Sequence, residues 1–134
     1  MGFYRTLPHL KEWLIIGPYQ GTHGCLRIAF GKGVCGAAAK LQQSQVVPDV
    51  HAFPGHIACA SSTQSEIVVP IMSPNGVLGV LDIDSDSPAA FDEVDQRALE
   101  SICMLLSRKS PPQRQGQDDI ADRELLSMGT KLTT

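Results

Sequence analysis

The stretch "EIVVPIMSPNGVLGVLDIDS", residues 66–85, constrains the fold more than any other part of this 134-residue chain. Two β-branched runs flank a Pro-Asn-Gly turn, and this pattern is a strong signal for an antiparallel hairpin. We predict its strands over residues 66–72 and 77–84. Because side chains alternate between faces, one face of the second strand carries Leu78, Val80, Asp82 and Asp84, and the other carries Val77, Gly79, Leu81 and Ile83. Two carboxylates therefore lie at the end of one otherwise apolar face of this strand.

The remaining elements are shorter or helical. The stretches "WLIIG", "LRIAF" and "SQVVPD" are strand candidates, and the Ala-rich "GVCGAAAKLQQ" predicts a short helix near residues 34–42. An amphipathic helix is predicted over residues 92–108, with Asp92 as its cap and basic Arg108 and Lys109 at the end where they suit the helix dipole. Its apolar residues at helical spacing are Val94, Ala98, Ile102 and Leu105. Helices and strands in irregular alternation around a central hairpin predict an α+β domain with one sheet covered by helices.

Composition sets the limits on size and partners. With 43% hydrophobic and 19% charged residues, the chain can bury one modest core, which we place in residues 1–108. Residues 109–134 are rich in Pro, Gln, Gly and Asp and are expected to be a flexible polar tail. The net charge of −3 and the scattered Lys and Arg residues argue against nucleic acid as a partner.

Location follows from what the chain does not contain. No apolar stretch approaches the roughly 20 residues of a membrane-spanning helix, and the start "MGFYRTLPHLKEW" lacks the apolar core of a secretory signal. We therefore expect a cytoplasmic protein that does not bind a membrane. In that reducing compartment, the cysteines are not expected to form standing structural disulfides.

Acidic residues are concentrated at the hairpin. Asp82 and Asp84 repel each other and resist desolvation, so they need water, a cation or an ammonium ligand between them. Glu66 begins the neighbouring strand and can lie close to the pair. Three acids around one concave spot suit a small, positively charged amino group. On residue type alone, the plainer alternative is favoured, in which Asp84 and Asp86 only start the turn into the next helix.

The cysteines raise several alternatives. Structural zinc sites usually bring ligands in tight C-x2-4-C or H-x3-5-H pairs. Cys25, Cys35 and Cys59 follow one another at intervals of ten and 24 residues, and His51 and His56 are the only paired candidates, so a metal site is disfavoured. A Cys-His hydrolase is poorly supported, because these histidines lie in the same loop as Cys59. Thiol redox chemistry on a small amine-bearing substrate remains.

The fourth cysteine, Cys103, is expected to be structural. Cys103 lies in the amphipathic segment, where a free cysteine is ordinarily a small core residue.

Three stretches carry a family resemblance: "GPYQGTHGCLRIAFGKGVCGAAA", "VVPDVHAFPGHIACASSTQSEIVVPI" and "GVLGVLDIDSDSPAAFDEVDQ". They closely resemble the free methionine-(R)-sulfoxide reductases, a family built on the GAF domain. The likeness runs almost continuously from Gly17 to about Leu106 and includes the spacing of the three loop cysteines. It implies a GAF fold, with an antiparallel sheet of about six strands flanked by helices. It also implies reduction of free L-methionine-(R)-sulfoxide to methionine, with thioredoxin as the reductant and no metal or organic cofactor.

The resemblance also implies roles for individual residues. Cys59 matches the catalytic cysteine, Cys25 the resolving cysteine that forms a disulfide with it, and Cys35 a third cysteine that acts as an alternative or relay resolver. The family's substrate-binding acids match Glu66, Asp82 and Asp84, and Tyr4 resembles an aromatic residue that lines the substrate pocket. In this chemistry a thiolate attacks the sulfoxide sulfur while the departing oxygen accepts protons. We expect Glu66 to donate the proton.

The chain departs from the family pattern at its start. Family members usually carry a leading helix and a tryptophan before the "GFY" strand, whereas this chain opens at "MGFY". We therefore expect exposed apolar surface on the sheet, which favours association into a homodimer. The functional alternatives are a non-catalytic GAF module that binds a small ligand and a redox sensor that uses a Cys25–Cys59 disulfide as its switch.

Overall fold

The computed structural model describes residues 1–21, 24–56 and 59–109. The tail predicted over 109–134 therefore lies outside the described residues, except for Lys109. The strands are β1 (Gly2–Leu7), β2 (Leu10–Tyr19), β3 (Arg27–Ala29), β4 (Gln45–Val47), β5 (Ser65–Ser73) and β6 (Gly76–Ser85). The helices are α1 (Gly33–Leu41) and α2 (Glu93–Lys109), with a 3-10 turn η1 at Val50–Ala52. Each predicted strand and helix is confirmed to within a few residues.

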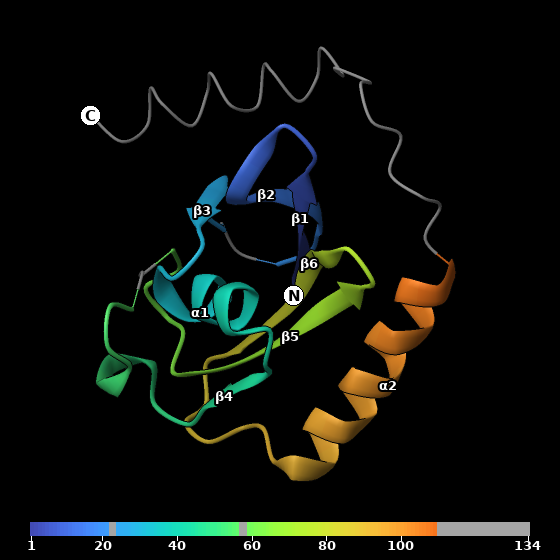
Figure 1. Cartoon of the computed structure of the whole chain (residues 1–134). Helices are drawn as coiled ribbons and strands as arrows, with labels where there is room; N and C mark the ends of the chain where they lie inside the picture. Colours follow the sequence, from blue (N-terminus) through green and yellow to red (C-terminus); the bar gives the residue numbers. More distant parts are fainter. Residues whose placement is uncertain (22–23, 57–58, 110–134) are drawn as a thin grey trace, which may run out of the picture.

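The strands form one antiparallel sheet in the order β3-β2-β1-β6-β5-β4 (Figure 1). The predicted hairpin is confirmed as β5 and β6, which pair from Ser65 opposite Ser85 to Ser73 opposite Gly76. Gly76 follows the turn with a φ of +124°, a conformation that a residue with a Cβ rarely adopts. The glycine of the Pro-Asn-Gly motif is thus required by the backbone.

A β-bulge corrects part of the predicted alternation in β6. Ile71 pairs with Gly79 but Met72 pairs with Val77, so Leu78 is an extra residue on the bulged strand. Val77 consequently packs against the core that contains Val80, whereas Leu78 packs against the core on the opposite face. The prediction that Leu78 shares a face with Val80 was wrong because alternation holds only where the register is unbroken.

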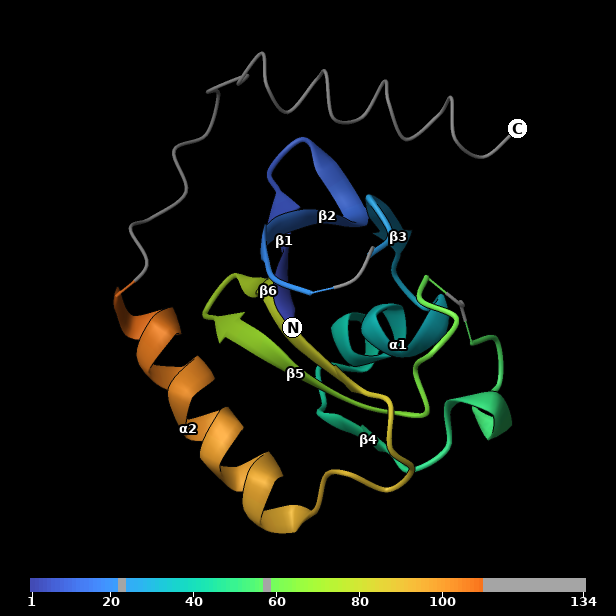
Figure 2. The ribbon, with the colours of Figure 1, turned by 180° about the vertical axis from the view of Figure 1, so that it is seen from behind.

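The two α-helices cover opposite faces of the sheet (Figures 1 and 2). Helix α1 contributes Val34, Cys35, Ala38 and Ala39 to a core that also contains Val68 and Val80. Helix α2 contributes Cys103 to the second core, with Ile67, Val69, Ile71 and Leu81. The alternating residues of β5 are therefore divided between the two cores, as a strand buried on both faces requires.

Helix α1 approaches β3 unusually closely, and Gly36 makes this approach possible. A Cβ on Gly36 would lie only 2.4 Å from the backbone oxygen of Ala29. The small residues of α1 thus hold its first turn, which includes Cys35, against the end of the sheet.

Helix α2 is capped as predicted, but its buried side differs from its apolar stripe. Asp92 and Asp95 cap the first turn reciprocally, each accepting a hydrogen bond from the other's backbone N–H, at 3.0 and 2.9 Å. Cys103 is buried, which confirms it as a core residue. In contrast, the exposed fractions of Val94, Ile102 and Leu105 are 72%, 48% and 55%. The helix rests on β5 through the side that carries Leu99 and Cys103, about a third of a turn from this stripe.

A largely apolar groove lies beside this helix. It is lined by Phe3, Tyr4, Arg5, Pro18, Ile71, Leu78, Gly79 and Leu106. Neither helix in the described part of the chain has the length and apolar character needed to cross a membrane.

Candidate active site

A pocket opens on the α1 side of the sheet and gathers most of the predicted site residues. Tyr4, Cys35, Cys59, Glu66, Asp82 and Asp84 all line it. Cys25 is brought to the same place by its bond to Cys59. Sequence reasoning did not single out several further lining residues: Tyr19, Gly24, Ile28, Lys32 and Thr63.

The hairpin register brings the three acids together. Glu66 on β5 pairs directly with Asp84 on β6, and Asp82 lies two residues earlier, opposite Val68. All three carboxyls therefore point to the α1 face. Glu66 and Asp82 are only 7% and 6% exposed. Asp84 is paired with Glu66 inside β6 and lines the pocket, so it does more than start the turn into the next helix.

Burial determines the protonation of these carboxyls. Desolvation raises the pKa of Glu66 to about 11, and the adjacent Asp82, as hydrogen-bond partner and as negative charge, adds to the increase. Desolvation and the charge of Asp82 raise the pKa of Asp84 to about 6. Desolvation also raises the pKa of Asp82, against the opposing effect of hydrogen bonds with Glu66 and Cys35. Glu66 therefore holds its proton at neutral pH.

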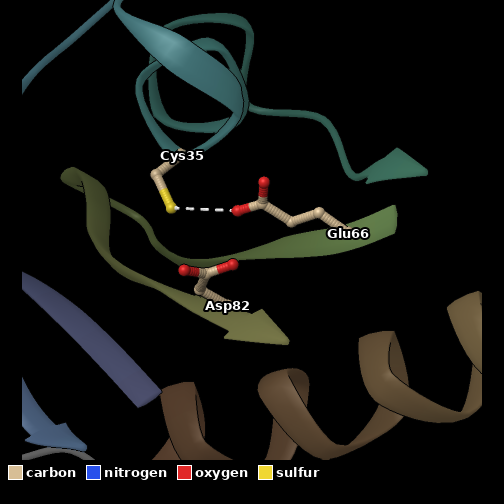
Figure 3. A group of neighbouring side chains, drawn as sticks. All are labelled: Cys35, Glu66 and Asp82. Carbon is tan, nitrogen blue, oxygen red and sulfur yellow. Dashed lines mark hydrogen bonds between the residues drawn. The ribbon is translucent and has the colours of Figure 1, made fainter. Parts of the chain in front are cut away.

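Cys35 meets these acids from the other side of the pocket (Figure 3). Its thiol donates a long hydrogen bond to Oε1 of Glu66, at 3.9 Å. A position in the first turn of a helix normally favours a thiolate. Here burial, followed by the charge of Asp82, raises the pKa of the Cys35 thiol well above its ordinary value. Cys35 is therefore a neutral thiol in this state.

One carboxylate oxygen in this cluster is left without a partner. Among the described residues, Asp82 Oδ1 is buried and has no hydrogen-bond partner. One ligand atom from each of Cys35, Glu66 and Asp82 lies within 4.8 Å of the other two, so these residues could hold a metal ion. The spacing rules for metal sites missed this cluster because its members come from α1, β5 and β6.

A disulfide joins Cys25 to Cys59 beside the pocket, with a distance of 5.3 Å between their Cα atoms. Cys25 lies between β2 and β3, and Cys59 lies between η1 and β5. The pairing that the resemblance implied is therefore present in the structure.

Two aromatic side chains complete the wall. Tyr4 is buried, and burial, with the charges of Cys35 and Asp82, raises the pKa of its phenol. Tyr19 lines the pocket beside it, and burial, followed by the charge of Asp84, raises its pKa too. Both phenols are therefore neutral hydrogen-bond donors at physiological pH.

His56 lies at the edge of the same pocket. Burial and the neighbouring His51 lower its pKa, and its Nδ1 is buried without a hydrogen-bond partner among the described residues.

Comparison with known proteins shows the family to which this chain belongs. A family model described as the GAF domain matches residues 5–108. The chain is 51% identical over 108 residues to the free methionine-R-sulfoxide reductase (fRMsr) of Saccharomyces cerevisiae, covering 80% of this chain and 60% of that protein. The chain thus spans about three fifths of the length of this curated relative.

Solved structures agree with this result. The reduced form of the Staphylococcus aureus fRMsr superposes with a TM-score of 0.73 at 46% identity, covering 80% of this chain and 68% of that one. The free methionine-R-sulfoxide reductase of Neisseria meningitidis, solved in complex with its substrate, gives a TM-score of 0.76 at 45% identity, covering 80% and 64%.

Proposed function

The chain belongs to the GAF-domain family and, within it, to the free methionine-R-sulfoxide reductases, and on this premise we propose that it reduces free L-methionine-(R)-sulfoxide to L-methionine. The observation that carries the proposal is the Cys25–Cys59 disulfide beside an acid-lined pocket. This is the arrangement expected at the end of a reductive cycle that uses two thiols.

The proposed cycle starts at Cys59. Its thiolate attacks the sulfoxide sulfur, the oxygen accepts a proton from Glu66, and methionine leaves as Cys59 becomes a sulfenic acid. The thiol of Cys25 then attacks the sulfenic sulfur, which forms the disulfide and releases water. Two electrons have passed from the two thiols to the substrate. Cys35 is the alternative resolver, although its raised pKa makes it the weaker nucleophile in the state described.

The acids supply proton donation and substrate selection. Glu66, with a pKa of about 11, keeps the proton that the departing oxygen needs at neutral pH. Asp82 and Asp84 bind the ammonium of the free amino acid, with Tyr4 beside them. A methionine sulfoxide within a protein chain has an uncharged amide nitrogen and gains nothing from these carboxylates.

The partners follow from the chemistry. A dithiol reductant of the thioredoxin class returns the disulfide to two thiols, and the cycle itself uses no metal or organic cofactor. Dependence on a reduced thioredoxin pool supports a cytoplasmic location, which we include in the proposal. We assign catalysis to residues 1–108 and treat 109–134 as a polar tail that does not take part. The exposed apolar side chains of α2 support association into a homodimer.

The test is NADPH consumption in an assay coupled to thioredoxin and thioredoxin reductase, with separate (R)- and (S)-sulfoxides of free methionine. The comparison is between the chain, its Cys59→Ser variant and a Cys103→Ala control, whose thiol lies in the other core. Turnover of the (R) form, retained by the control and lost in Cys59→Ser, is the expected result. A folded chain that forms the disulfide with peroxide but turns over neither sulfoxide would support the redox-sensor alternative instead.

A further inference from the structure

The buried cluster of Cys35, Glu66 and Asp82 contains an unusual combination of groups. A thiol and two carboxyls meet from α1, β5 and β6, and their potential ligand atoms all lie within 4.8 Å of one another (Figure 3). Asp82 is 6% exposed, and its Oδ1 has no hydrogen-bond partner among the described residues. A buried polar oxygen without a partner is uncommon in folded proteins and calls for an explanation.

We propose that Cys35, Glu66 and Asp82 form a binding site for a thiophilic divalent cation such as Zn²⁺, with Cys35 Sγ and one oxygen from each carboxylate as ligands. The site exists while Cys25 and Cys59 are joined, because Cys35 is a free cysteine in that state. It is a binding site only and supplies no step of the reductive cycle.

The thiol distinguishes a metal ion from an ammonium group. An ammonium is held by carboxylates and gains little from a neutral sulfur. A zinc-like ion binds thiolate strongly and also accepts carboxylate oxygens, whereas Mg²⁺ prefers oxygen ligands and keeps much of its water. The location of Cys35 between the two acids therefore favours a thiophilic ion.

The geometry is close to what such an ion requires. With Zn–S near 2.3 Å and Zn–O near 2.0 Å, tetrahedral angles place sulfur and oxygen ligands about 3.5 Å apart. Cys35 Sγ and Glu66 Oε1 are 3.9 Å apart. The ligand atoms, which lie within 4.8 Å of one another, must close by up to about 1.5 Å to reach bonding range, and side-chain torsions of Glu66 and Cys35 can supply this movement. The fourth position is left for water from the pocket.

Binding releases protons. Thiol and carboxyl ligands give up their protons to the buffer when they bind such an ion. The other titratable or charged groups that line the pocket are Tyr4, Tyr19, Lys32, His56 and Asp84. Of these, Asp84 contributes a further negative charge that favours the cation.

The experiment is a titration of the oxidised chain with Co²⁺, a spectroscopic substitute for Zn²⁺, followed by displacement with Zn²⁺. Because Cys25 and Cys59 are joined, the described residues offer only Cys35 and Cys103 as free thiols. We expect one thiolate-to-cobalt charge-transfer band that saturates at one ion per chain and disappears when Zn²⁺ is added. Excess Mg²⁺ is expected to leave the band unchanged.

Variants assign the ligands. Cys35→Ala should abolish the band, and the isosteric Asp82→Asn should weaken binding at least tenfold. Cys103→Ala, the matched control for a buried free thiol, should leave it unchanged. Circular dichroism melting checks that each variant is folded. Absence of a charge-transfer band in the parent chain, or its retention in folded Cys35→Ala, would overturn the proposal.

The binding result does not depend on the reductase activity. One consequence does rest on the proposed function: an ion on Glu66 and Asp82 occupies the groups assigned to the substrate, so Zn²⁺ bound there should inhibit turnover. A chain that binds cobalt through Cys35 without any turnover would refute the proposed function but not the cation site.

Discussion

Glu66 and Asp84 face each other as a directly paired couple across the β5–β6 hairpin. Backbone hydrogen bonding fixes this pairing, so the two carboxyls cannot separate without disturbing the sheet. Ionising all of the neighbouring carboxyls on the α1 side of the sheet would cost too much free energy. Glu66 therefore remains protonated.

Stability should decrease as the pH rises above the acidic range. In the unfolded chain these acids titrate near pH 4. In the folded chain the pKa of Asp84 is about 6 and that of Glu66 about 11, so the folded state binds more protons between about pH 4 and these values. The free energy of unfolding therefore falls as the pH rises through this window. Thermal melting at pH 5 and pH 8 should give the higher Tm at pH 5.

A single substitution tests the origin of this effect. Asp84→Asn should raise the Tm at pH 8 by a few degrees and reduce the difference between the two pH values. Asp86→Asn, at an exposed acid two residues away whose charge adds only a smaller increase to the pKa of Asp84, is the comparison and should change both by less. A parent protein whose Tm is the same at pH 5 and pH 8 would contradict the assigned pKa values.

Removing the proton donor should slow the chemical step. Glu66→Gln keeps the size of the side chain but cannot transfer a proton, and general acid catalysis typically contributes about 10²–10⁴-fold. We expect kcat for the free (R)-sulfoxide to fall by about that factor while KM changes little. Steady-state kinetics measure both constants, and Glu100→Gln on the exposed side of α2 is the control. A normal kcat would remove Glu66 from the role of donor.

Substrate binding should depend on the aspartates. Asp82→Asn or Asp84→Asn removes a charged partner of the substrate ammonium, and hydrogen bonds to charged groups contribute about 1.5–3 kcal/mol. KM for free methionine sulfoxide should therefore rise by about 10- to 100-fold. N-acetylmethionine sulfoxide, which lacks the ammonium, should be a poor substrate for the parent and both variants alike. Unchanged kinetics in the variants would refute these two assignments.

Helix α1 should not tolerate a larger residue at Gly36. Alanine has a higher helix propensity than glycine by about 1 kcal/mol, which by itself stabilises the helix. The added Cβ would lie 2.4 Å from the backbone oxygen of Ala29, and overpacking of this kind costs about 1–3 kcal/mol. We expect the steric cost to prevail, so Gly36→Ala lowers the urea midpoint. Lys40→Ala, exposed on the same helix, should leave it nearly unchanged, and a more stable Gly36→Ala would show that β3 can move away.

Most elements were predictable from local patterns, although β1 was not among the strands predicted from them. Alternation and a turn motif located β5 and β6, and glycine stops around an Ala-rich run located α1. Alternation failed at Leu78 because a bulge depends on how two strands pair, and neither strand specifies that alone. Helical spacing located α2 but did not show which side is buried, because the sheet beneath it determines that side.

Site residues were predictable where they lie within one hairpin. They were not predictable where the fold brings residues of several elements together. The acids at the hairpin follow from strand alternation and from the family resemblance. The contact between Cys35 and Glu66 joins residues 31 positions apart, and no local pattern reports such a separation. Tyr19 was missed for the same reason, since it lies at the end of β2 and joins residues of α1, β5 and β6 in the pocket.

The covalent link between Cys25 and Cys59 encloses β3, α1 and β4 in a loop with a sequence separation of 34. Closing a loop of this length limits the unfolded chain and stabilises the folded one by about 4 kcal/mol in the chain-entropy model. Under the proposed cycle, the reductant opens this loop once in every turnover. The helix that carries Cys35 then loses its covalent tether whenever the protein is ready to accept substrate. Heat and proteases should therefore inactivate the protein most easily when its reductant is plentiful and its substrate is scarce.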